Sequence, residues 1–271
     1  WETDWLPGPM REGVEVVDEV WTASLYCYHV FSRYHRRVFW IPHIVSPMQA
    51  PTPDDVAAVT ELLGAERDTL NVLTITHAMS RRKNEEALIE AFQYAHARFP
   101  NARLIIKTTD ETPAVHVSRA GPITTVSGIW SDGMISALYD RAHVYASAHC
   151  SEGWGLTLSD AMRRGVLTVA TAYSGNMDFM TPKNSLLVDF DERSIDPRHL
   201  YYYFAPGMRW AYARRDSLEA QLVRALTLIE TGQAAPIIAR AARDLRCYDV
   251  RHVGVLVRDR LRHIAALCER R

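Results

Sequence analysis

Short runs of apolar residues alternate with segments of helical period along most of the chain. The runs are rich in β-branched residues, and most carry apolar residues at successive positions, so that both faces of each strand would be covered. This pattern predicts a doubly wound α/β sheet of parallel strands with helices on both faces. The predicted strands are Val14–Trp21, Val38–Ile41, Leu70–Thr76, Arg103–Lys107, Thr124–Val126, His143–Ser147, Val166–Thr171 and Ser185–Val188.

The segments between these runs carry helix signals. Glu85–Phe92 gathers its apolar residues on one stripe, and Ser131–Arg141 opens with a serine suited to the N-cap. Leu156–Arg164 stops at Gly165, a natural helix terminator. After Val188 the strand pattern ends, and a helical C-terminal region is expected. Its predicted helices are Ser217–Glu230, Ala234–Leu245 and Val250–Cys268.

One segment cannot form regular structure. Pro42–Pro53 holds four prolines in a short span, and proline fixes its own φ and removes a backbone donor. We therefore expect a hinge between a small N-terminal piece, ending near Ile41, and the main domain.

Charge and cysteine usage narrow the classes of partner. The 271 residues include 31 basic and 32 acidic side chains, for a net charge of −1, so no global field recruits nucleic acid or membrane. The four cysteines show no CxxC spacing, which fits a reducing cytoplasm and argues against a zinc knuckle or a disulfide framework. No stretch approaches the roughly 20 apolar residues of a membrane span. The start at Trp1 lacks an initiator Met and a signal-peptide pattern, and we interpret it as that of a truncated or processed chain.

The segment Ser151–Met162 is the strongest candidate for chemistry. Gly153 and Gly155 lie in a predicted loop before a helix, where backbone N–H groups can approach a ligand and the helix N-terminus favours phosphate. Glu152 can accept hydrogen bonds from sugar hydroxyls, and Asp160 can reach back toward the same cleft. Paired acids around a glycine turn suit a polyol ligand. Taken alone, the segment fits equally a tight turn with two solvated acids.

Three further loops follow predicted strands. Ser80–Asn84 contains three cations that could neutralise a diphosphate, and Lys83 is the strongest candidate among them. Gly128, just past a strand, could expose backbone groups to a nucleobase edge, although an ordinary turn is as good an interpretation. Tyr173–Phe179 again places small polar groups at a strand end. Because the carboxyl ends of parallel strands share one edge of the sheet, the four loops together favour a ligand site.

The eleven histidines do not cluster at metal-ligand spacing. His149 lies near Glu152, and we expect it to pack against the loop. His77 follows a strand, and its role is ambiguous.

At this point the motifs resemble those of a known family. Residues 152–162 are similar to the E-G-F-G-L-x-x-x-E-A-M segment of the family 4 (group 1) retaining glycosyltransferases of GT-B fold. Residues 82–92 resemble that family's R-K-N…L-I-x-A-F, and residues 18–24 its D-E-V-W-x-x-S near the end of the acceptor lobe. The other segments that fit are Ile41–His43, Tyr173–Phe179, Thr181–Ser185 and Trp210–Ala211.

The resemblance implies transfer of a sugar from a nucleotide-sugar donor, with retention at the anomeric carbon and without a metal or other cofactor. Glu152 would be the catalytic residue, binding the donor sugar's hydroxyls and stabilising oxocarbenium-like charge. Lys83 and Arg82 would bind the diphosphate, and Asp160 the ribose. The residues expected at the base are Ser127, Gly128 and Ile129. The residues whose backbone N–H groups would hold sugar and phosphate are Gly153, Trp154, Gly155 and Leu156.

The donor would be a UDP-, GDP- or ADP-sugar, and the acceptor a glycan or a lipid-linked sugar. Residues 1–45 would be the remnant of the N-terminal acceptor lobe with the interlobe linker, and residues 46–271 the donor-binding domain with its C-terminal helices. We expect a cytoplasmic protein, and the missing lobe leaves open peripheral association with the inner face of the membrane.

Two features depart from the family pattern. Asp160 is one methylene shorter than the family's glutamate, and an acceptor lobe of about forty residues is too small for an ordinary domain. We therefore expect the chain alone to be inactive. The alternatives are a non-catalytic nucleotide-sugar-binding module or another GT-B enzyme, such as a sugar-phosphate synthase or an epimerase.

Overall fold

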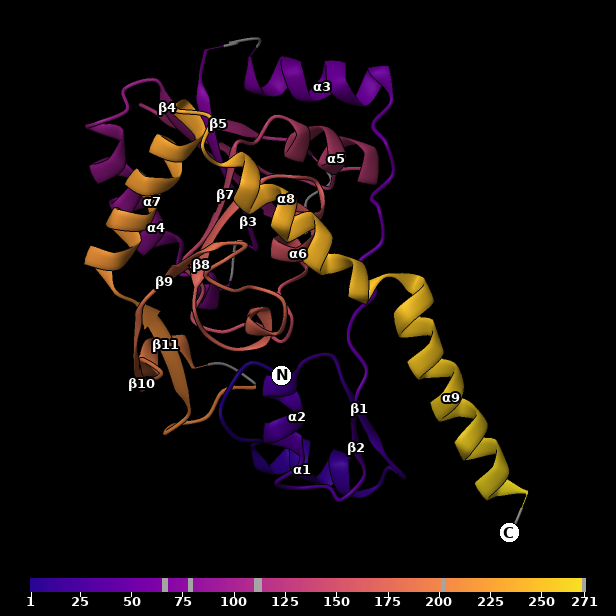
Figure 1. Cartoon of the computed structure of the whole chain (residues 1–271). Helices are drawn as coiled ribbons and strands as arrows, with labels where there is room; N and C mark the ends of the chain where they lie inside the picture. Colours follow the sequence, from indigo (N-terminus) through magenta and orange to yellow (C-terminus); the bar gives the residue numbers. More distant parts are fainter. Residues whose placement is uncertain (65–67, 78–79, 110–113, 201–202, 270–271) are drawn as a thin grey trace.

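A seven-stranded sheet lies at the centre of the computed structural model, which describes residues 1–64, 68–77, 80–109, 114–200 and 203–269 (Figure 1). The strand order is β5-β6-β4-β3-β7-β8-β9, and only the pairing of β5 with β6 is antiparallel. The strands are β3 (Leu70–His77), β4 (Ala102–Thr109), β5 (Val117–Ala120), β6 (Ile123–Val126), β7 (Val144–Ser147), β8 (Leu167–Thr171) and β9 (Leu186–Val188). This topology confirms the predicted doubly wound α/β fold.

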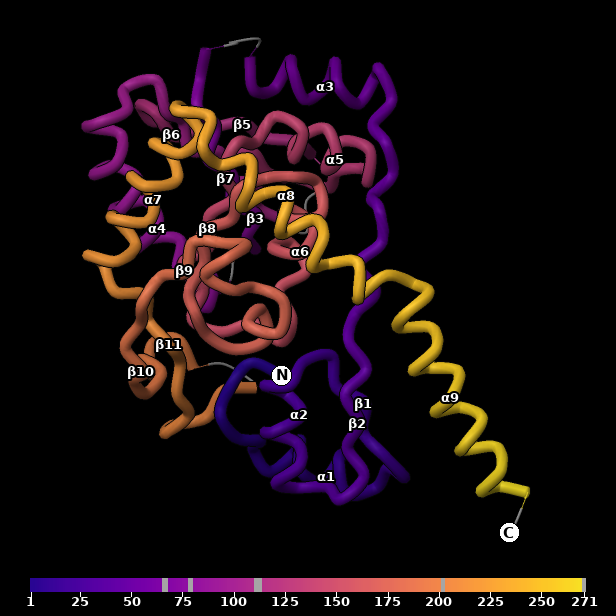
Figure 2. Tube along the Cα trace, in the orientation of Figure 1, coloured from indigo at the N-terminus to yellow at the C-terminus, as the bar shows by residue number. Residues whose placement is uncertain are grey.

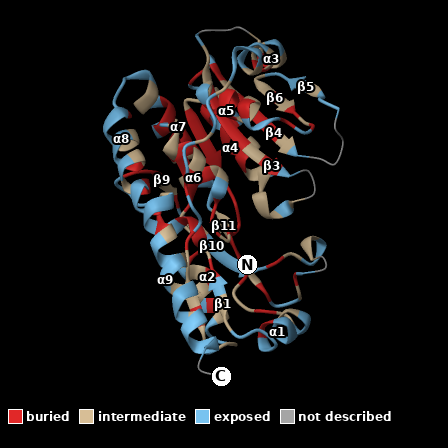
Figure 3. Cartoon of the chain, turned by 90° about the vertical axis from the view of Figure 1, so that its right-hand side faces the viewer, coloured by how far each residue is buried: buried red, intermediate tan, exposed pale blue. Residues whose placement is uncertain are grey.

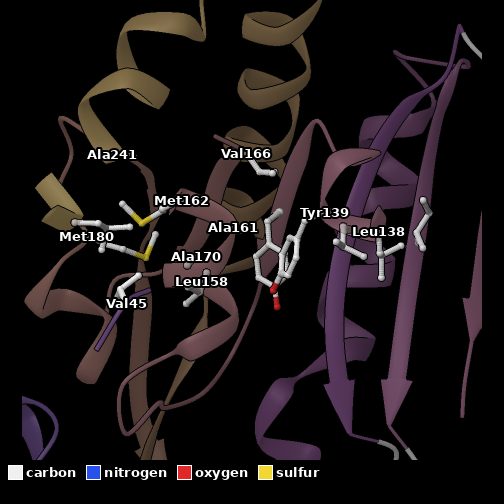
Figure 4. Packing of buried hydrophobic residues seen from close by; sticks show 14 of the residues in the cluster. Val45, Leu138, Tyr139, Leu158, Ala161, Met162, Val166, Ala170, Met180 and Ala241 are labelled. Carbon is white, nitrogen blue, oxygen red and sulfur yellow. The ribbon is translucent and has the colours of Figure 1, made fainter. Parts of the chain in front are cut away.

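Both faces of the sheet are covered, as the two-faced apolar pattern of the strands requires. Successive residues of one strand enter different cores: Val72 packs with residues of the helices on one face, and Leu73 with those on the other. The helices on the Val72 face are α4 (Glu85–His96) and α7 (Arg215–Glu230). The helices on the Leu73 face are α3 (Pro53–Leu63), α5 (Asp132–Asp140), α6 (Leu156–Arg163) and α8 (Ala235–Asp244). Figure 3 shows the buried layer, and Figure 4 shows part of the Leu73-face core around Tyr139 and Met162.

The N-terminal piece forms a small separate layer, and the trace in Figure 2 shows it beside the lower end of the main domain. Its elements are α1 (Gly8–Glu15), β1 (Val20–Thr22), α2 (Leu25–Phe31) and β2 (Val38–Trp40), with β1 and β2 parallel. The proline-rich segment 41–52 has no regular structure, as predicted. The C-terminal helix α9 (Val250–Cys268) returns to this piece, where Arg260 pairs with Glu19 and lies 3.5 Å from the centroid of the Phe39 ring.

Two predicted element boundaries are wrong. Val14–Trp21 is not one strand, because α1 continues to Glu15 and the β1 strand begins only at Val20. The strand pattern also continues past Val188. The antiparallel strands β10 (Phe190–Ser194) and β11 (Arg209–Ala213) form a ribbon whose Trp210 is fully buried. Short 3₁₀ turns complete the chain: η1 (Arg81–Lys83), η2 (Gly175–Asp178), η3 (Pro197–His199) and η4 (Leu245–Tyr248).

Two loops at the carboxyl edge of the sheet pack tightly against each other. Gly175, which begins η2 after β8, donates its N–H to the carbonyl of Glu152 after β7 over 2.9 Å. A Cβ atom at Gly175 would lie 2.4 Å from the Gly153 carbonyl oxygen, well inside van der Waals contact. The absence of a side chain at Gly175 therefore sets how closely these loops approach.

We expect Gly175→Ala to lower the free energy of unfolding by about 1–3 kcal/mol, because the added methyl group overpacks the junction of the two loops. Gly254→Ala in α9 is the matched control, since nothing lies within 4 Å of a Cβ atom there. In that control the free energy of unfolding should rise by about 0.5–1 kcal/mol, because alanine has a higher helix propensity than glycine. Urea unfolding measures both changes. A Gly175→Ala protein as stable as the unchanged chain would contradict the tight junction.

Candidate functional site

The site lies where the winding of the sheet reverses. From β3 the chain moves outward to β4 and β6, and from β7 it moves the other way to β8 and β9, so β3 and β7 are neighbours at the switch point. Ligands of open α/β sheets bind beyond the carboxyl ends of the strands at such a point. The loop after β3 carries Arg82 and Lys83 in η1, and the loop after β7 carries Glu152.

A cluster of charged side chains joins these two loops. The Nζ atom of Lys83 lies 2.5 Å from Oε1 of Glu152, and Nη1 of Arg82 lies 3.2 Å from the same oxygen. Arg82 also donates from Nη1 to the Ser151 carbonyl over 2.5 Å, and its Nε atom lies 2.7 Å from Oε2 of Glu2. Residues 69 or more positions apart in the sequence thus form one partly buried network.

The two carboxylates of this charged cluster respond differently to their surroundings. Burial alone raises the pKa of the Glu152 carboxyl, but the adjacent Lys83 and Arg82 cations outweigh burial and lower its pKa to about 2. For Glu2, burial is the largest effect and raises the pKa of the carboxyl above its ordinary value. The Arg82 cation lowers this pKa, and the negative charge of Glu152 raises it further. Glu152 is therefore held ionised at neutral pH.

A cavity of about 430 Å³ opens beside the charged cluster. The main domain contributes Lys83, Glu152, Gly153, Trp154, Gly155, Leu156 and Thr157 to its lining. The N-terminal piece and the linker contribute Trp1, Glu2, Trp21, Thr22, Ala23, Cys27, Phe31 and His43. The main-domain side thus carries the charged pair Lys83 and Glu152, and the other side carries the aromatic rings of Trp1, Trp21 and Phe31.

Contacts around the cavity hold the N-terminal piece against the main domain. The N–H of Leu25 at the start of α2 donates to Oδ2 of Asp178 over 2.9 Å. The hydroxyls of Tyr26 and Tyr173 lie 3.3 Å apart. Both partners in the main domain belong to the segment 173–178 after β8, which also packs on the Glu152 loop.

Asp160 lies on the second turn of α6, outside the lining of this cavity. Its carboxyl is half-buried, and burial raises its pKa to about 6. Within the described part of the chain, no side chain or backbone group hydrogen-bonds to it. A carboxylate in this state is partly desolvated and able to accept hydrogen bonds from a ligand.

The predicted base-binding residues Ser127, Gly128 and Ile129 follow β6, which β4 separates from β3, and they do not line the cavity. Gly128 has a φ of +97°, and a Cβ atom there would lie 2.7 Å from the Ala114 carbonyl oxygen. The residue type at Gly128 is therefore imposed by the turn.

His149 has the packing role that the sequence predicts. It is fully buried, with Nδ1 3.1 Å from the Ser147 hydroxyl and Nε2 3.1 Å from Oδ1 of Asn176. Burial lowers its pKa to about 4, so it is neutral at physiological pH and braces the loop after β7 against η2.

Sequence reasoning missed two features of the site. Glu2 lines the cavity and binds Arg82, and no motif in the sequence marks it. The buried Lys107 at the end of β4 donates to the Gly128 carbonyl, and a lysine within an apolar strand was a usable signal. Among the described residues, no group of three or more His, Cys, Asp or Glu side chains is placed to hold a metal ion, and no helix could cross a membrane.

Comparisons with solved structures show the same architecture. Sucrose-phosphate synthase from Thermosynechococcus elongatus aligns with a TM-score of 0.69 and 18% identity, over 95% of this chain and 61% of that chain. The pneumococcal O-GlcNAc transferase GtfA, solved with UDP and GlcNAc, aligns with a TM-score of 0.64 and 14% identity, over 98% of this chain and 52% of that chain. Anabaena HepE, solved with UDP and glucose, aligns with a TM-score of 0.65 and 16% identity, over 94% of this chain and 68% of that chain.

The chain therefore spans between 52% and 68% of the length of these three structures, and at such identities the likeness establishes the fold. No curated protein matches the sequence significantly. Residues 64–195, which include both the Lys83 loop and the Glu152 loop, match the family model described as glycosyl transferases group 1. Over these residues the chain is similar to the group 1 glycosyltransferases, and its fold is the GT-B fold of the structural neighbours.

Proposed function

We propose that this chain is the donor-binding part of a retaining glycosyltransferase that transfers a sugar from a UDP-, GDP- or ADP-sugar to a glycan or a lipid-linked acceptor in the cytoplasm. The observation that carries the proposal is the contact of Lys83 and Arg82 with Glu152 at the β3–β7 switch point. The adjoining cavity of about 430 Å³ has the size of a small-molecule site. Structural neighbours solved with UDP and a sugar support the same class of donor.

The charge balance of the free site suits exchange with a diphosphate. Arg82 and Lys83 are neutralised by the carboxylates of Glu2 and Glu152. A doubly ionised diphosphate offers oxygens to the same cations, and the N-terminus of α6 adds favourable dipole there. Binding would thus replace carboxylate contacts by phosphate contacts without an added metal.

Glu152 is suited to the sugar that follows the diphosphate. When the bond between the anomeric carbon and the phosphate oxygen breaks, positive charge builds on the sugar ring and negative charge on the leaving diphosphate. The ionised Glu152 would stabilise the first, and Lys83 with Arg82 the second. The acceptor hydroxyl would then approach from the side of the N-terminal piece, where Trp21 and Phe31 line the cavity.

The other parts of the donor would be bound by residues around the charged cluster. The half-buried carboxyl of Asp160 would accept hydrogen bonds from the ribose hydroxyls. The turn of Ser127, Gly128 and Ile129 would bind the base. Backbone N–H groups of the segment Gly153–Leu156 would hold the sugar and phosphate at the helix start.

Lys83→Ala should weaken binding of nucleoside diphosphates about ten- to a hundredfold, because a charge-assisted hydrogen bond to phosphate is lost. Titration calorimetry with UDP, GDP and ADP, in the presence of a chelator, measures the loss. Lys183→Ala is the matched control, since Lys183 is exposed and lies outside the cavity lining, and its affinity should stay unchanged. Undetectable binding of all three nucleotides to the unchanged chain would refute the donor site.

Donor affinity should fall as the pH drops below about 6, where the Asp160 carboxyl becomes protonated and no longer accepts from ribose. The ligand for this titration is a nucleotide sugar, because its phosphodiester groups do not titrate in that range. Affinity should fall by up to about tenfold per pH unit below the pKa and stay constant above it. Asp160→Asn should remove this dependence. A wild-type profile that is flat from pH 7 to about 5 would exclude Asp160 from ribose binding.

Glu152→Gln should lower turnover about 10²–10³-fold while changing nucleotide affinity far less, because the carboxylate acts on charge that develops in the transition state. The measurement needs a form of the protein that transfers sugar, with rates and dissociation constants taken on the same sample. Equal losses in turnover and affinity would reduce Glu152 to a binding residue. Donor binding without transfer in every form of the protein would favour the non-catalytic module.

A further inference from the structure

Lys107 is a buried cation that the proposed reaction does not use. It ends the apolar run of β4, and only 2% of the residue is exposed. Lysine is almost never fully buried, because removing an ammonium group from water is costly unless strong partners replace the water. The partners that the structure describes for its ammonium therefore bear on the role of this lysine.

The ammonium of Lys107 lies under the turn that follows β6. Its Nζ atom donates to the carbonyl of Gly128 over 2.8 Å and to that of Thr108 over 2.9 Å, and it lies 5.2 Å from the centroid of the Trp130 ring. The Nε1 atom of Trp130 in turn donates to the Ser127 carbonyl over 3.2 Å. Two consecutive carbonyls of the turn are thus occupied from inside the protein.

The same peptide group that accepts from Lys107 also carries a donor. The carbonyl of Gly128 and the N–H of Ile129 belong to one amide, so a cation on the oxygen draws electron density from the nitrogen and strengthens its N–H as a donor. Within the described residues the Ile129 N–H has no hydrogen-bond acceptor, and 62% of Ile129 is exposed. The strengthened donor is therefore available to a ligand.

The turn cannot easily present a different group. Gly128 has a φ of +97°, and the backbone of Ala114 lies against the position where its Cβ would be, at 2.7 Å. The N–H of Ser127 is also engaged, donating to the His116 carbonyl over 3.0 Å. With the carbonyls of Ser127 and Gly128 occupied and the Ser127 N–H engaged, the Ile129 N–H is a donor that the turn presents outward.

We propose that Lys107 is a positioning residue for nucleobase recognition, which fixes and polarises the Gly128–Ile129 peptide so that its N–H binds a base carbonyl. The site would accordingly take a keto base, uracil or guanine, whose exocyclic oxygen accepts a hydrogen bond. Adenine carries an amino group in the corresponding place and would set donor against donor. This inference rests on the proposed function, which places the base at this turn.

The test compares a ligand with a base and a ligand without one. Lys107→Met keeps an unbranched side chain, shorter by one atom, and removes the charge. In calorimetry it should weaken the binding of UDP and GDP about ten- to a hundredfold. Inorganic pyrophosphate should bind the variant and the unchanged chain equally, because its contacts lie at Lys83. Lys83→Ala is the contrast, and should weaken pyrophosphate and the nucleotides together. The unchanged chain should also bind UDP or GDP more tightly than ADP, and Lys107→Met should narrow that difference.

A second variant keeps the test decisive if Lys107→Met does not fold. Trp130→Phe retains the ring beside Lys107 but removes the hydrogen bond to the Ser127 carbonyl, and should give a smaller loss with the same selectivity for base-bearing ligands. Circular dichroism and thermal unfolding check that each variant is folded. If Lys107→Met does not fold, the Trp130→Phe result decides.

The outcomes separate this inference from the proposed function. An unchanged chain that binds pyrophosphate and no nucleoside diphosphate, or neither, would refute the proposed donor site itself. Nucleotide binding that survives Lys107→Met, or that falls equally with pyrophosphate binding, would overturn only the role of Lys107. If the unchanged chain binds ADP more tightly than UDP and GDP, the assignment of a keto base is overturned.

Discussion

The ion pair between Lys83 and the buried Glu152 is the interaction on which the site depends. Its members follow neighbouring parallel strands, β3 and β7, so the reversal of winding places a cation from one loop against a carboxylate from the other. Burying the Glu152 carboxylate without a cation beside it would be strongly unfavourable, and Lys83 makes that burial tolerable. Arg82 and Glu2 extend the pair into a charge-balanced cluster. The cations are thereby held in position before any anionic ligand arrives, which reduces the cost of ordering them on binding.

The same loops also hold the N-terminal piece. Gly175 packs on the Glu152 loop, and the segment it belongs to receives Leu25 and Tyr26 from α2. On the far side, α9 fastens the piece through Arg260 and Glu19. The segment that packs on the Glu152 loop is therefore the same one that contacts the N-terminal piece. An acceptor that settles on its aromatic lining would act on the same contacts.

The sequence predicts the sheet well because its evidence is local. Successive apolar residues such as Val72 and Leu73 require cover on both faces, and this is what the two cores provide. The ribbon of β10 and β11 was missed because Phe190–Ser194 is mostly polar and becomes a strand only by pairing with residues 209–213. The Val14–Trp21 strand was wrong because β-branched residues also occur at the end of a helix, and α1 reaches Glu15.

The candidate site could likewise be predicted from the sequence only where the evidence is local. Loops that follow strands can be predicted to share an edge, which brought Lys83 and Glu152 into one hypothesis from motif and topology alone. The contact of Glu2 with Arg82 joins residues about eighty positions apart, and no periodicity encodes such a contact. Lys107 is different, because a charged residue inside an apolar run is a visible violation of the pattern. Such violations mark positions where packing is sacrificed for another purpose.

Lys83 and Lys107, both near the carboxyl edge of the sheet, show two distinct uses of a lysine cation. Lys83 lines the cavity and pairs with a carboxylate, so an incoming phosphate can displace its partner. Lys107 is buried and bonded to backbone carbonyls, which cannot be displaced without unfolding the turn. The first arrangement exchanges its contacts when ligand binds, and the second keeps a backbone donor fixed throughout. If the site binds and releases a diphosphate as proposed, the first kind of contact suits the position where charge moves, and the second suits the position where the identity of the ligand is recognised.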